Sequence, residues 1–179
     1  MCLEGDKQSY DYWESQWKSG DKKFWCAFSD KGEGMVYVRE KGVINGGVSY
    51  LMDTIERRIY YMAGRTAYNL GFEREDVDWE NVSRFPNTYQ ADNMRARYAF
   101  GITDFEDGIA KVSWGITPDP MYSADSDGYG MGDDEVILCA FIDRHCRVLV
   151  KFQSMEKQEK EMECRKLALA RLNEESVKE

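Results

Sequence analysis

Hydrophobic and polar side chains alternate through two neighbouring stretches of this chain, and this period of two constrains the fold most strongly. The first stretch covers 94–102, the second covers 110–117, and the short polar segment 104–108 lies between them. Such alternation is typical of a β-strand with one buried face. Two such strands around a short segment that contains glycine predict an antiparallel hairpin. Trp114 lies on the apolar side of the second strand, so we expect it in the core.

Four more apolar stretches extend the strand pattern in both directions. A continuous apolar run covers 136–142 and an alternating run covers 147–152, with four residues between them. A gap this short predicts a tight turn, which makes the C-terminal half a four-strand meander. Nearer the N-terminus, 23–29 and 35–39 flank a polar gap with two glycines and predict another hairpin. Together these stretches predict an antiparallel sheet of about six strands.

Apolar residues at helical spacing predict a long central helix over 48–70. They recur every three or four positions, while arginines and an aspartate lie toward the other side. An apolar stripe of this width is how a helix covers a sheet. The residues of the stripe are Val48, Leu51, Met52, Ile55, Ile59, Met62, Ala63 and Leu70.

Two further helices are predicted toward the two ends of the chain. Over 9–18, three aromatic residues recur at spacings of three and four, which predicts a helix that docks on the core. Over 154–176, a charged stretch has only a thin apolar stripe, so we expect a helix that is half exposed and projects in part. These stripes are Tyr10, Trp13 and Trp17 in the first helix, and Met155, Met162, Leu169 and Leu172 in the second.

The elements together predict a single α+β domain over residues 1–179. In this fold the antiparallel sheet packs against the long central helix and the C-terminal helix, whose charged part spans 154–179. A chain of 179 residues with 42% hydrophobic residues is long enough to bury one core. No apolar run approaches the roughly 18 residues that cross a bilayer, and the polar N-terminus is no secretory signal. We therefore expect a soluble cytoplasmic protein, with no membrane contact.

The cysteines agree with a reducing compartment. Five cysteines occur at irregular spacing without a C-x-x-C pair, which argues against a disulfide framework and a common structural zinc site. We predict free thiols, with Cys26 and Cys139 as small core residues. Cys2 leaves one alternative open, because the mature end of a bacterial lipoprotein also begins near a cysteine.

Negative charge is concentrated in one part of the chain. The formal net charge is -9, which argues against direct nucleic-acid binding because phosphate neutralisation requires excess lysine and arginine. The window 104–135 alone holds nine acidic residues and one basic residue, Lys111. Its most unusual part is the 18-residue gap 118–135, which contains six acids, no base and three glycines. Long gaps between strands are commonly functional or disordered.

Three interpretations of 118–135 stay open: a solvated loop, a calcium site and an acidic arm that docks on a protein. Asp125, Asp127, Gly130 and Asp133 fit four positions of a calcium loop. However, Tyr129 occupies a position that requires an oxygen ligand, and Val136 replaces the bidentate glutamate. As a docking arm, the carboxylates would steer approach and the tyrosines would anchor the partner. The residues of this interpretation are Tyr122, Asp125, Asp127, Tyr129, Asp133 and Asp134.

No catalytic motif stands out. The single histidine, His145, lies in a predicted turn, and its neighbour Cys146 is close in sequence only. A phosphatase loop would require an arginine where Phe152 stands, and both glycine-rich nucleotide motifs are missing. We therefore predict no cofactor and no metal, and enzymatic activity is not favoured.

The leading hypothesis is an acidic protein-binding module: an inhibitor, an immunity-type protein or an assembly factor. It would dock on the basic surface of a partner protein through 118–135. The alternative is an enzyme or small-ligand binder with a pocket between the curved sheet and the helix over 48–70. A third class is a structural subunit held by the C-terminal helix, and a homo-oligomer is left open. The pocket of the alternative would be lined by Arg65, Arg97, Tyr98 and Trp114.

Overall fold

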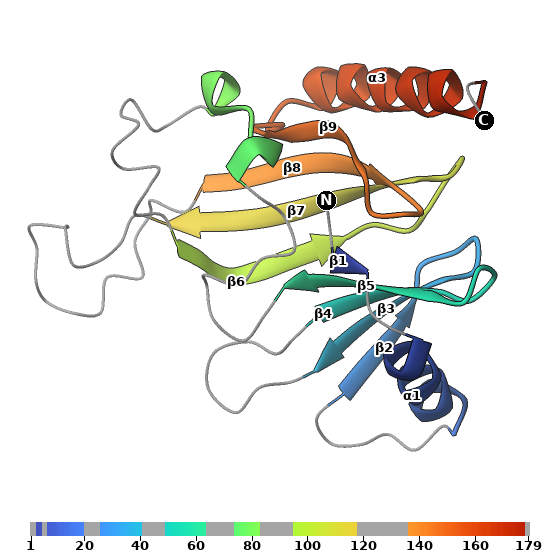
Figure 1. The fold of residues 1–179 in the computed structure, drawn as a ribbon. Helices are drawn as coiled ribbons and strands as arrows, with labels where there is room; N and C mark the ends of the chain where they lie inside the picture. Colours follow the sequence, from blue (N-terminus) through green and yellow to red (C-terminus); the bar gives the residue numbers. More distant parts are fainter. Residues whose placement is uncertain are drawn as a thin grey trace, which may run out of the picture.

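Two antiparallel sheets lie at the centre of the molecule, and a helix lies against the outer side of each (Figure 1). The computed structural model describes residues 3–4, 7–19, 26–40, 49–63, 74–82, 95–117 and 136–177. The predicted α+β class with antiparallel sheets is confirmed. The prediction of one six-strand sheet is wrong, because the strands of the two halves of the chain form separate sheets.

The first sheet contains the strands of the N-terminal half in the order β1-β5-β4-β3-β2. Its strands are β1 (Leu3–Glu4), β2 (Cys26–Asp30), β3 (Met35–Glu40), β4 (Ser49–Asp53) and β5 (Arg58–Ala63). All neighbours are antiparallel, and the pairing of β2 with β3 confirms the hairpin predicted over 23–29 and 35–39 within the described residues. Helix α1 (Lys7–Lys18) precedes β2 and confirms the helix predicted over 9–18.

The second sheet is the predicted C-terminal meander, with the order β6-β7-β8-β9. Its strands are β6 (Arg95–Ile102), β7 (Ile109–Thr117), β8 (Val136–Asp143) and β9 (Val148–Gln153). Helix α3 (Gln158–Ser176) follows and closes the chain, close to where the C-terminal helix is predicted. Two short 3-10 helices, η1 (Arg74–Asp76) and η2 (Trp79–Asn81), precede this sheet.

The predicted central helix over 48–70 is wrong in its described part, because 49–63 forms the hairpin of β4 and β5. Leu51 packs between the sheets, and the next residue, Met52, packs under α1. Because β4 is buried on both faces, consecutive apolar residues replace the alternation that identifies a half-exposed strand. Periodicity alone does not separate such a run from a buried helix. Ile55, expected on the buried stripe, is 68% exposed in the turn.

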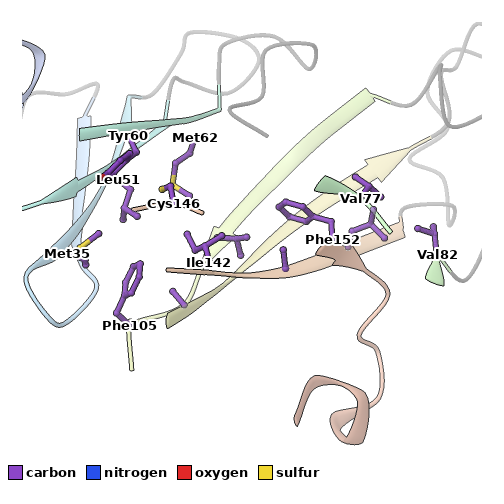
Figure 2. Packing of buried hydrophobic residues seen from close by; sticks show 14 residues of the cluster. Met35, Leu51, Tyr60, Met62, Val77, Val82, Phe105, Ile142, Cys146 and Phe152 are labelled. Atoms are coloured by element: carbon purple, nitrogen blue, oxygen red, sulfur yellow. The ribbon is translucent and has the colours of Figure 1, made fainter. Parts of the chain in front are cut away.

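The two sheets share one hydrophobic core (Figure 2). From the first sheet it contains residues such as Met35 and Leu51, and from the second sheet it contains Leu138 and Ile142. Figure 2 shows Phe105 reaching this core from the β6–β7 turn. The opposite face of each sheet packs against its own helix. The layer order is therefore helix, sheet, sheet, helix, which buries both faces of both sheets in part.

The helices dock through partly unexpected faces. In α1, Tyr10 and Trp13 are buried as predicted, and Trp17 packs against the same cluster. In α3, the predicted stripe is wrong at Met162, which is 53% exposed. Cys164 is buried in its place. The two residues are two positions apart in sequence, so their side chains lie about 200° apart around the helix axis.

Candidate functional site

The connections between strands differ in length at the two ends of the molecule. At one end, four short turns join consecutive strands: 31–34, 54–57, 103–108 and 144–147. This turn end lies on the right in Figure 1. At the other end, the strands border the longer connections 41–48, 64–94 and 118–135. We call this the long-connection end.

The segment 118–135 lies outside the described residues, so its predicted partner-binding residues are not placed. The structure does place the strands that carry it. Ile116 of β7 pairs directly with Val136 of β8, in the middle of the second sheet. Antiparallel partners lie about 5 Å apart, so the segment leaves and re-enters the sheet at nearly the same point. The unplaced residues are Tyr122, Asp125, Asp127, Tyr129, Asp133 and Asp134.

The acidic window 104–135 is not one surface in the fold. Its first acids lie in the β6–β7 turn, whereas 118–135 begins after β7 has crossed the sheet. Nine residues of β7 at about 3.3 Å each separate these two places by roughly 30 Å. The acids of the window therefore belong to two segments that adjoin opposite ends of β7.

The acids at the turn end are accompanied by basic side chains from other elements. Arg165 of α3 lies 3.3 Å from the Glu106 carboxylate and 3.1 Å from that of Asp107. Lys31 Nζ lies 3.6 Å from Asp104 Oδ1. Lys111, the one base of the window, lies 2.8 Å from Glu161 of α3.

The alternative ligand pocket loses the wall that was predicted for it, because 49–63 is a strand hairpin. Arg65 lies outside the described residues. For Arg97, Tyr98 and Trp114, only the backbone within β6 and β7 is described, so neither the pocket nor the predicted core position of Trp114 is tested. The pairing of β6 with β7 shifts in register between Ala96 and Phe100, which includes Arg97 and Tyr98. Such bulges re-aim side chains and are frequent near active sites.

A buried ion pair that sequence reasoning missed connects the two sheets at the turn end. Asp53, at the end of β4, is fully buried, and its carboxylate oxygens lie 2.9–3.3 Å from Nη2 and Nε of Arg144. The same carboxylate accepts the backbone N–H groups of Ile55 and Glu56, which shapes the β4–β5 turn. Arg144 Nη1 also donates to the Glu33 carbonyl oxygen. Three turns therefore converge on the Arg144 guanidinium group. Its hydrogen bonds to Asp53 and Glu33 hold the two sheets together at the turn end.

His145 lies beside this ion pair, in the turn where it is predicted. Its Nε2 atom lies 3.1 Å from Glu56 Oε2, and its Nδ1 atom lies 4.0 Å from Asp143 Oδ2. The Asp143 carboxylate also accepts Arg147 Nε at 2.6 Å and the backbone N–H of His145. Cys146 is buried between the sheets, so these residues do not form an accessible nucleophile and base. The contacts of His145 and Asp143 fit a turn that has a structural role and no catalytic one.

A second interaction group fixes α1 to the β4–β5 turn. Arg57 lies 2.9 Å from the Asp11 carboxylate and 3.0 Å from that of Glu14, and it stacks 5.0 Å from the Tyr10 ring centre. The Tyr10 hydroxyl donates to Glu14 at 3.1 Å. Burial, assisted by the Glu14 carboxylate, raises the pKa of Tyr10 to about 12. Sequence spacing identifies the Tyr10 face, but the partner Arg57 is found only through the hairpin.

Within the described ranges, no group of three or more His, Cys, Asp or Glu side chains is arranged to hold a metal ion. The calcium interpretation of 118–135 falls outside these ranges. Neither α1 nor α3 is long and apolar enough to span a membrane. Comparisons of the chain with family models, with curated proteins and with solved structures found no match.

Proposed function

We propose that this chain is an acidic protein-binding module that docks on a basic surface of a partner protein through 118–135. The observation that carries the proposal is the density of charge, six acids and no base within 18 residues. Such a segment attracts a basic surface before contact and raises the association rate. Inhibitors, immunity-type proteins and assembly factors are the functional classes that fit, and we propose a cytoplasmic location.

The frame beneath the segment supports this proposal. Because Ile116 pairs with Val136, both ends of 118–135 are anchored on adjacent central strands. The turns that connect the two sheets lie at the opposite end, where Asp53 and Arg144 form their ion pair. A binding segment on a scaffold fixed elsewhere is the arrangement expected of a recognition surface.

Lys111, the single basic residue of the window 104–135, does not neutralise the acids of 118–135. Lys111 Nζ lies 2.8 Å from Glu161 Oε1, which places the lysine against α3. A partly exposed ion pair of this kind is weak, but it engages the lysine away from the long-connection end. The tyrosines Tyr122 and Tyr129 supply the aromatic area that slows dissociation from a partner.

A polylysine peptide on a sensor surface tests the electrostatic part of this proposal. Replacing Asp125, Asp127, Asp133 and Asp134 with Asn should lower the association rate at low salt by about tenfold or more. A matched control makes the same change of charge on α3 and beside it, through Glu156→Gln, Glu159→Gln, Glu163→Gln and Glu174→Gln. These four glutamates are exposed on or next to α3. Equal losses in the two variants would show that only net charge matters, and would contradict a site at 118–135.

The tyrosine contribution is measured separately on the partner. Capture from native lysate at low salt, release at high salt and identification of the released protein supply that partner. Replacing Tyr122 and Tyr129 with Ala should then raise its dissociation rate and leave its association rate nearly unchanged. A parent-like dissociation rate would remove the tyrosines from the proposed interface.

A second candidate function is small-ligand binding beside β6, in place of the pocket predicted against a central helix. The observation that favours it is the register shift between Ala96 and Phe100, which includes Arg97 and Tyr98. Arginine would select an anionic ligand. Citrate and phosphate are suitable probes: a rise in melting temperature that Arg97→Gln abolishes would support this function, and no shift with either anion would argue against it.

A further inference from the structure

Strand β2 has a free outer side at the edge of the first sheet. It is the last strand in the order of that sheet, and within the described ranges no strand pairs with its outer side. Figure 1 shows it as the outermost strand of this sheet. A free edge carries unpaired N–H and C=O groups that can pair with a strand of another chain, so proteins commonly shorten, bulge, charge or cover their edge strands.

The other three sheet edges each have such a protective feature in the described part of the chain. Strand β1 is only two residues long. The pairing of β6 with β7 contains a register shift between Ala96 and Phe100. Val77 forms a bridge with Phe152 of β9, which covers part of that edge. In contrast, β2 spans the five residues Cys26–Asp30 and pairs with β3 without a register shift.

The hydrogen bonds of the β2–β3 hairpin show which backbone groups of β2 point outward. The Lys31 N–H donates to the Met35 carbonyl oxygen at 2.8 Å, so the next pair along the ladder, Asp30 with Val36, is a pair without direct hydrogen bonds. The backbone groups of Asp30 therefore point away from β3. Because this direction alternates along an antiparallel strand, every second residue of β2 does the same. The outward-pointing residues are Cys26, Phe28 and Asp30.

The two faces of β2 differ in what covers them. The Phe28 ring lies 6.3 Å from the Trp13 ring, on the face that α1 covers. Ala27 and Ser29 point to the opposite face, and both are exposed, so the second sheet does not cover them. Asp30 is also exposed, and its carboxylate accepts the backbone N–H of Gly32 in the following turn. A strand that approaches this edge therefore meets exposed, small side chains on one face and an aromatic ring on the other.

We propose that two copies of this chain pair through their β2 strands, antiparallel around a two-fold axis at Phe28. In this register Phe28 lies opposite Phe28 of the second copy, and position 30 lies opposite position 26. These are the residues whose backbone groups point outward, and each of the resulting pairs exchanges two hydrogen bonds. A two-fold interface requires a self-complementary surface. The edge of β2 is self-complementary because its outward groups are arranged symmetrically about Phe28.

The side chains of β2 favour a second copy as the occupant. Phe28 opposite Phe28 forms an aromatic cross-strand pair beside Trp13, which is a favourable pairing. Asp30, the one charged residue of β2, lies opposite the uncharged position 26, so no like charges face each other. The remaining pair joins Ala27 to Ser29, which are both small. A second copy thus supplies a strand that matches the edge in length, in hydrogen-bonding groups and in charge.

The size of the edge predicts a weak dimer. Five residues at about 3.4 Å each give an edge of roughly 17 Å. An interface built on this edge is smaller than the roughly 1,200 Å² of a standard stable complex, so the dimer should depend on protein concentration. This inference is independent of the proposed binding function, because β2 belongs to the first sheet and the second sheet carries 118–135.

Sedimentation of the full-length protein with reductant, from about 1 µM to about 1 mM, tests the proposal through two matched variants. Both change only Ala27 and Ser29, which are exposed and face each other across the two-fold axis. Ala27→Lys with Ser29→Lys places like charges opposite each other twice, and should raise the Kd of the dimer at least about tenfold. Ala27→Lys with Ser29→Glu places opposite charges there, and should keep the parent Kd or lower it.

A parent protein that stays monomeric at every concentration would overturn the proposal and leave the edge to a strand of a different protein. Equal Kd values for the two variants would overturn it as well, because the dimer would then form elsewhere. Melting temperatures close to that of the parent verify that both variants fold.

Amide hydrogen exchange of the unsubstituted protein provides a test that needs no variant. The amides of Phe28 and Asp30 should exchange more slowly at about 1 mM than at about 50 µM, because the second copy accepts their hydrogen bonds. The amides of Ala27 and Ser29 pair with β3 in both states and should not change. A dimer in which the Phe28 and Asp30 amides exchange at the monomer rate would contradict pairing through β2.

Discussion

The two ends of this molecule differ in how the chain connects its strands. At the turn end, short turns from both sheets meet through Arg144, and the Glu33 carboxylate accepts the Gly108 N–H of a fourth turn. At the long-connection end, 19 residues instead separate the paired residues Ile116 and Val136. Short turns that contact one another fix a scaffold, whereas long connections supply the freedom in sequence that recognition requires.

Removing the arginine of the turn end should produce the largest loss of stability. Arg144→Ala leaves the buried Asp53 carboxylate without its cationic partner, which costs about 3–5 kcal/mol for a buried pair. Urea unfolding measures the change. Arg57→Ala is the control, because this arginine is half exposed where it pairs with Asp11 and Glu14, so its removal should cost much less than the removal of Arg144. Equal losses in the two variants would contradict a special role for the turn end.

A glycine of the β2–β3 turn provides a sharper test of the contact between turns. Gly34 has a φ of +78°, and a Cβ atom there would lie 2.8 Å from the Ile55 side chain. Gly34→Ala should therefore destabilise the fold by about 1–3 kcal/mol, through backbone strain and this clash. In a Gly34→Ala, Ile55→Ala double variant, the steric part should disappear. An additive double variant would show that the two turns do not touch in solution.

The contact of α1 with the β4–β5 turn should make stability depend on pH in the alkaline range. The folded pKa of Tyr10, about 12, is above its ordinary value of 10.0, so folding favours the protonated hydroxyl. Its contribution is complete below pH 10 and is lost as the pH rises through 12. Tyr10→Phe should flatten this part of the curve of unfolding free energy against pH. An unchanged slope between pH 10 and 12 would place the titration elsewhere.

The smallest effects on stability are expected at the long-connection end. Replacing Asp125, Asp127, Asp133 and Asp134 with Asn should change the unfolding free energy by less than about 0.5 kcal/mol for each residue. Thermal unfolding of the four-fold variant measures the sum. A loss of several kcal/mol would mean that these carboxylates stabilise the fold rather than bind a partner.

The predictable part of the fold follows the exposure of each strand. The hairpin of β6 and β7 alternates clearly, and its strands are found within one or two residues of their predicted limits. The hairpin of β4 and β5 is buried on both sides, at Leu51 and Met52, so its apolar run mimics a helix. When a helix covers the outer side of a sheet, its strands can be buried on both faces, and the alternation of apolar and polar residues that identifies a strand is then lost.

Local sequence signals could have shown part of the error. Asp53 begins a turn, since its carboxylate accepts two backbone N–H groups, and aspartate is common at this position in turns. Ile59, Tyr60 and Tyr61 favour strand over helix. The ion pair of Asp53 with Arg144 could not be predicted, because its members are 91 residues apart and meet only when the sheets pack.

The most direct test of the central claim replaces 117–135, which includes the proposed binding segment, with a two-residue Asn-Gly turn. The pairing of Ile116 with Val136 provides the strand ends for such a hairpin. If this segment is the binding surface and the turn end holds the scaffold, the shortened protein keeps its melting temperature and loses binding to polylysine and to the captured partner. Retained partner binding with unchanged kinetics would contradict the account and move the interface elsewhere on the molecule.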